Sequence, residues 1–451
     1  MKLNLTEYLR QELSIKGLEE LLIDERPLWR IVRSEFRDVY MGGGQITVPP
    51  NVRPFDILLN VCRSAGTITK VLLCGKKCKY IFLPHPRLFD INGMYMDRLT
   101  DPLIDYSDIK DEYIILERHQ NGTHKRPRYH SEKVVYLDVI DVLGKVFGKL
   151  LKPYYARKYR RNIEDLINLL KTELVFNETI IKAMFERLIA EHKVLCKLIY
   201  PLLNSLSPKY VFYAPRDTFF HVVDYCKKRH ITCCEMQHGV VVADSLLYTG
   251  IYNRQIDPDY FLVFGKDNIS RYFGLPLDLV KNVGFPFKNY VNDLGLESYG
   301  PSVVLFVSEP QITNEMIGNL AELATIYPQF EYHIRLHPHE DLSTKQRNCI
   351  DRVPNMKVVD NSVESFCALS RYTAIVGENS SVLYEAMSLG KKVGRFNYGG
   401  LVVIESQLIH GGTVLNSPKD FYRFMNESYD NANDSKEIYS DYQRETMKQF
   451  V

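Results

Sequence analysis

Two clusters of polar residues in the last third of the chain have the residue types that bind phosphate. His337 follows an apolar run at 332–336, and Ser380 and Ser381 follow a second apolar run at 373–376. Helical spacing comes after each cluster, which predicts strands that lead into helices of a parallel sheet. Ligands of such sheets bind beyond the carboxyl ends of the strands. The serines then begin a helix, whose unpaired N–H groups favour an anion such as phosphate; a simple N-cap is the alternative.

The residues of this region resemble the nucleotide-binding domain of GT-B enzymes. The shared features are a His-Pro pair, a Ser-Ser pair about 40 residues later, and Glu-Ala and Leu-Gly in the next helix. The resemblance is greatest to bacterial capsule, teichoic-acid and lipopolysaccharide transferases with CMP- or CDP-activated donors: polysialyltransferases, Kdo transferases and teichoic-acid glycerophosphotransferases. It implies that His337, Ser380 and Ser381 contact the donor phosphates and that Glu385 holds the donor ribose. Arg335 is expected to add positive charge there, or to pair within the sheet.

A third cluster supplies candidate catalytic groups. Glu235 and His238 lie at the end of a predicted strand at 231–237, in the sequence EMQHG. This sequence resembles the His-Gly turn of teichoic-acid polymerases, whose histidine is proposed as the base. An imidazole with an ordinary pKa of about 6.5 can take a proton from an acceptor hydroxyl at neutral pH. We therefore expect His238 to be the base, with Glu235 and Asp244 as alternatives; strand alternation places Glu235 on the face opposite His238.

Residues 144–161 form a basic segment with interleaved aromatic residues. The segment has seven Lys and Arg residues and no acidic residue. Lys149, Lys152, Arg157 and Arg160 are candidates for contact with an anionic acceptor or a membrane surface, where each basic residue adds about 1 kcal/mol. A solvated helix face packed on the N-terminal domain is the alternative.

Composition favours a protein of two domains that is cytoplasmic or bound at the inner face of the cytoplasmic membrane. The 451 residues are 45% hydrophobic, which is enough for two cores, and the net charge of +2 argues against a dedicated nucleic-acid binder. The nine cysteines lack a Cys-x-x-Cys pair, as expected for reduced thiols. The N-terminus carries charges throughout, unlike a signal peptide, and no apolar run approaches the roughly 20 residues of a membrane span.

The alternation of apolar runs and helical spacing predicts an α/β protein of the GT-B class, with two Rossmann-like domains facing a cleft. The predicted parts are an N-terminal helical segment (1–52), an acceptor domain (53–288) with a helical insertion (140–205), a nucleotide-donor domain (301–430), and a C-terminal helix (431–451) that packs back across the hinge. Within the acceptor domain, a strand is predicted at 56–61. His85 is expected in a turn or an acceptor-binding loop after the next strand.

These features predict a glycosyltransferase that moves a sugar from a CMP- or CDP-linked donor to a surface polysaccharide or lipid-linked glycan. No cofactor or metal is expected, because the one Asp-x-Asp sequence, Asp257-Pro258-Asp259, precedes a strand and is typical of a turn. The acidic motif of polysialyltransferases is missing near the front of the chain. One alternative is a non-hydrolysing UDP-sugar 2-epimerase, which should carry a Gly-x-Arg-Pro-Glu turn that this sequence lacks. The other is a non-catalytic nucleotide-sugar-binding subunit.

Overall fold

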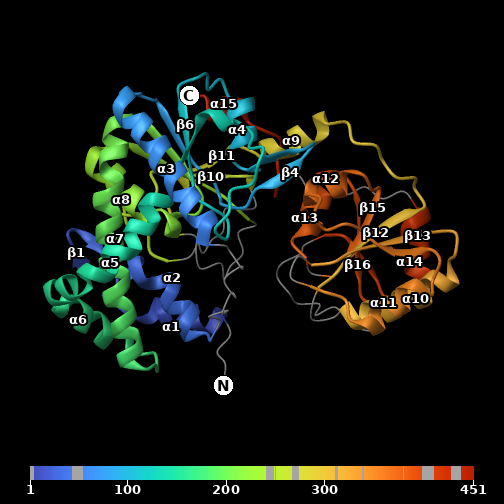
Figure 1. Cartoon of the computed structure of the whole chain (residues 1–451). Helices are drawn as coiled ribbons and strands as arrows, with labels where there is room; N and C mark the ends of the chain where they lie inside the picture. Colours follow the sequence, from blue (N-terminus) through green and yellow to red (C-terminus); the bar gives the residue numbers. More distant parts are fainter. Residues whose placement is uncertain are drawn as a thin grey trace.

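Two parallel sheets with helices packed on them form two domains, joined through α9 (Pro286–Asp293) (Figure 1). The computed structural model describes residues 5–42, 54–239, 248, 250–266, 274–309, 313–337, 340–378, 380–398, 411–427 and 438–450. The predicted α/β fold of the GT-B class, with two Rossmann-like domains, is confirmed by this arrangement.

The N-terminal domain is built on a seven-stranded sheet in the order β11-β10-β9-β8-β3-β6-β7, with every neighbouring pair parallel. Its strands are β3 (Tyr80–Leu83), β6 (Tyr113–Glu117), β7 (Val134–Tyr136), β8 (Tyr210–Tyr213), β9 (Thr232–Met236), β10 (Tyr260–Val263) and β11 (Val280–Asn282). The chain begins in the middle at β3, adds β6 and β7 on one side, and later adds β8 to β11 on the other. The strand order therefore reverses between β3 and β8, the position at which doubly wound sheets bind ligands.

The C-terminal domain repeats this plan with six parallel strands in the order β14-β13-β12-β15-β16-β17. These are β12 (Val303–Val307), β13 (Glu331–Arg335), β14 (Met356–Val358), β15 (Ala374–Gly377), β16 (Lys392–Phe396) and β17 (Thr413–Leu415). The accompanying helices are α10 (Thr313–Ile326), α11 (Thr344–Asp351), α12 (Ser365–Ser370), α13 (Val382–Ser388) and α14 (Pro418–Asn426). Here the order reverses between β12 and β15, so the loops after these two strands lie at the second switch point.

The first helices of the chain pack on the helical insertion and share a core with it. The elements are α1 (Leu5–Ser14), the short strands β1 (Leu22–Ile23) and β2 (Arg26–Pro27), α2 (Leu28–Tyr40), α5 (Asp138–Lys158), α6 (Arg160–Leu170) and α7 (Glu178–Leu206). Trp29 is 1% exposed, its ring lies 5.5 Å from that of Phe36, and Phe36 lies 6.0 Å from Phe185 of α7. Segments far apart in the sequence thus form one helical body beside the N-terminal sheet.

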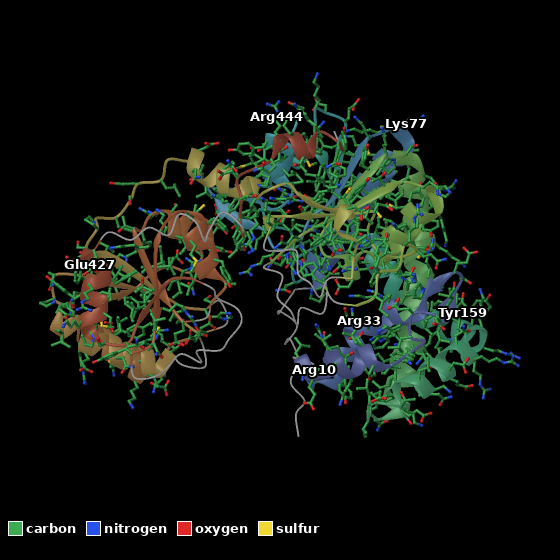
Figure 2. All side chains as sticks on the ribbon, turned by 180° about the vertical axis from the view of Figure 1, so that it is seen from behind. Arg10, Arg33, Lys77, Tyr159, Glu427 and Arg444 are labelled. Carbon is green, nitrogen blue, oxygen red and sulfur yellow. The ribbon has the colours of Figure 1, made fainter. Side chains whose placement is uncertain are left out.

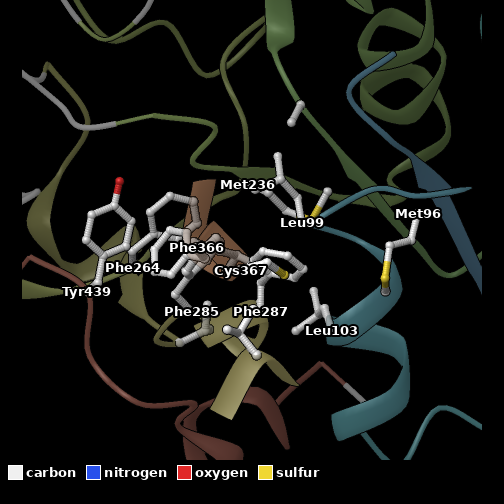
Figure 3. Close-up of a cluster of buried hydrophobic side chains, with 14 of the residues drawn as sticks. Met96, Leu99, Leu103, Met236, Phe264, Phe285, Phe287, Phe366, Cys367 and Tyr439 are labelled. Carbon is white, nitrogen blue, oxygen red and sulfur yellow. The ribbon is translucent and has the colours of Figure 1, made fainter. Parts of the chain in front are cut away.

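An aromatic cluster crosses the junction between the two domains (Figure 3). Phe285, at the start of α9, lies 5.2 Å from Phe366 of α12 and 5.3 Å from Tyr439. The segment at 438–450, which includes α15 (Arg444–Met447), belongs to the N-terminal body: the N–H of Ser440 donates to the carbonyl of Phe264 at 2.8 Å. Figure 2 accordingly shows Arg444 with the N-terminal domain and away from Glu427 of the C-terminal domain.

Two local predictions are wrong. The strand predicted at 56–61 is part of one long helix, α3 (Pro54–Cys74), which begins at a proline that favours a first helical turn. This helix is long and apolar enough to cross a membrane, contrary to the expectation that no segment approaches that length. The hairpin of β4 (Phe89–Ile91) and β5 (Met94–Met96), together with α4 (Asp101–Tyr106), was not anticipated. The helix before β9 is α8 (Phe220–Arg229).

Candidate functional site

Loops that follow β3 and β9 meet in a small cavity on the N-terminal domain. The cavity has a volume of about 170 Å³ and is lined by His85, Arg87, Phe89, Asp97, Arg98, Leu99 and His238. The rings of His85 and His238 lie nearly parallel, with their centroids 6.0 Å apart. The volume is below the roughly 300–1,000 Å³ of pockets for whole drug-sized ligands, so the cavity suits one part of a larger ligand.

Both imidazoles in this cavity are neutral at physiological pH. Burial lowers the pKa of His85 to about 4, with the positive charges of Arg98 and Arg87 acting in the same direction. Burial also lowers the pKa of His238 to about 4, helped by His85 and Arg98. The hydroxyl of Tyr248 lies 2.6 Å from Nδ1 of His238 and holds the ring, which leaves Nε2 as the nitrogen for a ligand. A neutral imidazole can accept a proton.

Asp97 is the carboxyl group of the same cavity. It accepts hydrogen bonds from the backbone N–H and the hydroxyl of Thr100, at 2.8 Å and 2.7 Å. Burial, with the negative charge of Asp101, raises the pKa of Asp97 to about 7. The cavity therefore combines a carboxyl group that keeps a proton near neutrality with imidazoles that lose theirs well below it. The acid and base partners of an active site typically have pKa values that their surroundings shift in opposite directions.

Arg98 connects this cavity to the C-terminal domain. Its Nη1 lies 3.3 Å from Oε1 of Glu385 and 3.6 Å from Oε1 of Glu364. Glu364 begins α12 and accepts the N–H of Cys367 at 3.1 Å, and burial raises its pKa against the opposing charge of Arg98. In Glu385, Oε2 is buried and has no hydrogen-bond partner within the described ranges. Such an acceptor is costly to leave unpaired, so a ligand hydroxyl is expected there. The predicted contact of Glu385 with a ribose remains a prediction.

The three predicted phosphate residues lie at one edge of the C-terminal sheet, after strands that flank β12 on both sides. The N–H of His337 donates to Oγ of Ser308, which directly follows β12, at 3.0 Å. Ser381 begins α13, and its side chain accepts no hydrogen bond from the helix backbone. Ser380 is half-buried beside it. The structure thus brings all three to the second switch point, and their contact with phosphate stays a prediction.

Arg335 is held by other groups of the protein. Arg335 donates to the carbonyl of Val363 at 2.7 Å, and burial lowers its pKa while the charges of Glu364 and Glu385 oppose that shift. Its guanidinium therefore interacts electrostatically with Glu364 and Glu385, the two glutamates that also contact Arg98. The contact of Arg335 with phosphate stays a prediction.

Glu235 lies in a buried ionic network and is 0% exposed. It accepts the backbone N–H of Arg216 at 3.1 Å, and burial raises its pKa to about 7. Arg216 is also paired with Asp257, which lies 3.3 Å from Arg30. This geometry does not support the predicted catalytic role of Glu235, because its carboxylate faces the domain core and does not line the cavity of His238. Asp244, the other alternative, lies outside the described residues.

Both carboxylates of the Asp-Pro-Asp sequence form ion pairs within the protein. Asp257 pairs with arginines, and Asp259 pairs with Lys227 at 2.6 Å. Over the ranges that the structure describes, no group of three or more His, Cys, Asp or Glu side chains is arranged to hold a metal ion. Independence of metal and cofactor remains a prediction.

The four basic residues predicted to contact an acceptor or membrane have different surroundings. Lys152 lies 3.4 Å from Glu186, and Arg160 lies 2.9 Å from Glu164. Lys149 and Arg157 are exposed on α5. Among the described residues, Lys149 and Arg157 have no acidic partner, so their charges are available to an external partner.

Glu378, at the end of β15, gives a prediction about stability. Burial, with the charges of Glu309 and Glu315, raises its pKa from 4.5 to about 8. A carboxyl group with a raised folded-state pKa stabilises the fold fully below the unfolded value and loses this contribution as pH rises to the folded value. We expect the free energy of unfolding to fall by roughly 2–4 kcal/mol between these pH values. Urea unfolding of Glu378→Gln should show a flatter pH dependence.

The matched control for this measurement is Glu445→Gln, because the Glu445 side chain is 82% exposed. The control should keep the pH dependence of the wild type. Equal slopes in wild type and Glu378→Gln would contradict the raised pKa.

Comparisons with known proteins find similarity at the level of structure. No protein-family model and no curated protein matches the chain. The UDP-GlcNAc 2-epimerase of Neisseria meningitidis, in a structure bound to UDP-GlcNAc, has a TM-score of 0.49 at 13% identity, over 83% of this chain and 99% of that one. The UDP-GlcNAc 2-epimerase of Methanocaldococcus jannaschii has a TM-score of 0.44 at 10% identity, over 80% and 97%. The glycotransferase of kitacinnamycin has a TM-score of 0.43 at 9% identity, over 83% and 98%.

These similarities concern the fold. The GT-B part of the resemblance agrees with them, whereas the narrower group of capsule, teichoic-acid and lipopolysaccharide transferases is not confirmed. The prediction of a surface-polysaccharide transferase with a CMP- or CDP-linked donor is corrected, because the similar structures include several UDP-GlcNAc 2-epimerases.

Proposed function

We propose that this chain is an enzyme that acts on a nucleotide sugar and inverts the C2 centre of a UDP-linked sugar. The observation that carries the proposal is the cavity in which Asp97 and His238 have pKa values moved in opposite directions beside Arg98. This proposal replaces transfer to an acceptor with a reaction that needs the nucleotide sugar alone.

Inversion at C2 requires one group that removes the hydrogen from one face of the sugar and another that returns a proton to the opposite face. The C2 hydrogen is not acidic by itself, so its loss must accompany departure of the nucleotide diphosphate from C1. The C–H electrons form the C1=C2 double bond, and the C1–O electrons leave with the diphosphate. Return of a proton to the other face and of the diphosphate to C1 completes the reaction. Two proton carriers are therefore needed, whereas activation of an acceptor hydroxyl needs one base.

The residues of the site fit these tasks. A neutral His238 can take the C2 proton, and a protonated Asp97 can supply one. Arg98 and Arg87 place positive charge next to both, where negative charge develops on the departing diphosphate. Glu385, with one buried oxygen still to be paired, would accept from a hydroxyl of the nucleotide sugar.

The test is hydrogen exchange at C2 in deuterated water. We expect the purified chain, given UDP-GlcNAc and no acceptor, to incorporate deuterium at C2 and to form the second epimer, both visible by proton NMR. UDP-GlcNAc is the first substrate to try because the N. meningitidis structure contains it. Recovery of the sugar without deuterium and without a second epimer, for UDP-GlcNAc and other UDP-hexoses alike, would overturn the proposal.

Replacement of the two serines should weaken nucleotide binding. Ser380→Ala with Ser381→Ala removes two hydroxyl donors at the second switch point, and a hydrogen bond to a charged group contributes about 1.5–3 kcal/mol. We expect the Kd for UDP to rise at least about tenfold in isothermal titration. The control is Ser14→Ala on the exposed end of α1. Equal affinities in the double variant and the control would remove the phosphate site from this edge of the sheet.

A further inference from the structure

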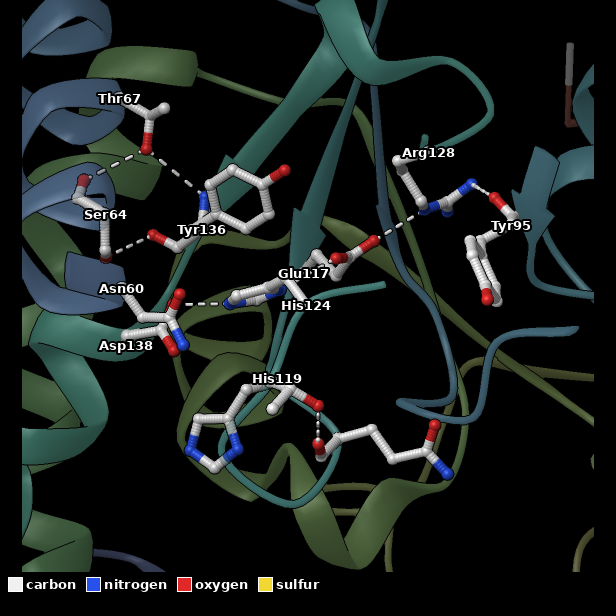
Figure 4. A network of polar contacts seen from close by, with 12 residues as sticks. Asn60, Ser64, Thr67, Tyr95, Glu117, His119, His124, Arg128, Tyr136 and Asp138 are labelled. Atoms are coloured by element: carbon white, nitrogen blue, oxygen red, sulfur yellow. Dashed lines mark hydrogen bonds and ion pairs between the residues drawn. The ribbon is translucent and has the colours of Figure 1, made fainter. Parts of the chain in front are cut away.

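The helix α3 packs on its domain with the polar side inward. Oγ of Ser64 donates to the carbonyl of Tyr136 at 2.6 Å, and Oγ1 of Thr67 accepts the N–H of Tyr136 at 3.3 Å (Figure 4). One turn earlier, Nδ2 of Asn60 donates to the carbonyl of Gly122 at 2.9 Å. Asn60 and Ser64 are buried, together with Val71 near the other end of the helix. Hydrogen bonds to the backbone of β7 and its neighbours therefore hold this helix in place.

The outward side of α3 is apolar. The exposed fractions are 69% for Phe55, 44% for Ile57, 59% for Leu58, 41% for Leu59, 44% for Leu72 and 82% for Leu73. The whole helix carries only three charged residues, Asp56, Arg63 and Lys70. A surface helix of a soluble domain normally turns its apolar stripe to the core and its charges to water. In α3 this order is reversed, which indicates that its outer side meets something other than water.

The neighbouring helix α5 extends this apolar surface. It packs beside α3 and lies against α7 through Gly144 and Gly148; a Cβ added at Gly148 would be 2.7 Å from Cγ of Glu191. That close approach fixes which side of α5 faces outward. The exposed apolar residues of this side are Val146, Phe147, Leu150, Leu151 and Tyr154, with exposed fractions from 39% to 66%. Exposed apolar side chains gathered on two neighbouring helices are typical of an interaction site.

The charges beside the apolar side chains are positive. Lys145, Lys149 and Arg157 are exposed on α5 and have no acidic partner among the described residues. From residue 142 to residue 161 the sequence has no acidic residue. Apolar side chains bordered by exposed Lys and Arg match a surface that is apolar beneath and anionic on top, as in a bilayer with acidic lipids.

We propose that α3 and the outer side of α5 form a docking surface for an anionic membrane, with α3 lying along the bilayer. The helix is long enough to span, but spanning would separate Ser64 and Thr67 from the backbone groups of Tyr136 and leave those buried groups without these partners. A second copy of the chain is a poorer occupant, because a two-fold contact would bring the basic surface of one copy against the same basic surface of the other. The docking surface does not depend on the reaction at the cavity.

The experiment is co-sedimentation of the full chain with vesicles of phosphatidylcholine alone and of phosphatidylcholine with phosphatidylglycerol. We expect binding to the second kind, weakened by salt. Leu58→Glu with Leu150→Glu should abolish it, and Lys145→Glu with Lys149→Glu should weaken it at least about tenfold. The matched control is Leu277→Glu, since Leu277 is 69% exposed on the same domain but outside this surface. The control should bind like the wild type.

Three results would overturn the proposal. Failure of both the wild type and the control to sediment with either vesicle would exclude a lipid surface. Sedimentation velocity could show a dimer that only Leu58→Glu with Leu150→Glu dissociates, which would assign the surface to a second copy. Resistance of the bound wild type to extraction at alkaline pH would show a spanning helix. Unchanged C2 exchange on soluble UDP-GlcNAc in all variants would show that membrane binding is independent of the proposed reaction.

Discussion

Replacement of Arg98 by glutamine is expected to lower kcat/KM for the nucleotide sugar between about a hundredfold and a thousandfold. Arg98 lines the cavity and also contacts the acidic pair of the other domain, with Nη1 at 3.3 Å from Glu385 and 3.6 Å from Glu364. Removal of one partner of such a buried pair leaves uncompensated charge that costs about 3–5 kcal/mol. The variant also loses positive charge where the diphosphate would depart. Steady-state kinetics of epimer formation measures the effect.

Two variants calibrate this result. Arg98→Lys keeps the charge but not the planar guanidinium whose Nη1 lies near both glutamates, so we expect it to recover part of the activity. Arg444→Gln removes an exposed ion pair with Asp108 in the last segment and should leave turnover unchanged. A folded Arg98→Gln protein with the turnover of the wild type would show that the contact between the domains plays no part in the reaction.

Much of the fold was predictable because parallel strands are buried on both sides and are nearly continuous apolar runs. β12 and β15 follow this rule, and the positions of β13 and β15 agree with the apolar runs predicted at 332–336 and 373–376. α3 breaks the rule because its apolar residues face outward, so an apolar run at 56–61 does not mark a buried strand. The packing of α1 and α2 on α7 was beyond reach, since it depends on contacts between residues more than a hundred positions apart.

The site was predictable only where it follows strand ends. His238 and His337 lie directly after strands, so their position at the sheet edges could be inferred from the sequence. Asp97 and Arg98 follow an unexpected hairpin, and no spacing marks them. The pKa of Asp97 rises through burial, and Arg98 meets Glu385 across 287 residues of sequence. Both properties arise from tertiary packing, which local patterns do not report.

Asp97→Asn and His238→Asn should each reduce C2 exchange by about 10²–10⁴, the usual contribution of a positioned acid or base. The wild type should show a bell-shaped dependence of kcat/KM on pH. Activity should fall below about pH 4, where His238 gains a proton, and above about pH 7, where Asp97 loses one. Asparagine cannot ionise, so the residual activity of Asp97→Asn should lack the alkaline limb. Exchange measured by NMR over a pH series tests both limbs.

A purely structural role for either residue predicts a different outcome, because damage to the fold lowers activity at every pH and also weakens binding of UDP. The matched control is His230→Asn, since His230 is exposed at the end of α8 and asparagine tolerates its positive φ of 55°. Normal UDP affinity in Asp97→Asn, together with loss of the alkaline limb, would place Asp97 in the proton path. An alkaline limb that survives in Asp97→Asn would transfer the acid role to another group, and Glu364, whose pKa is also raised by burial, would be the next to replace.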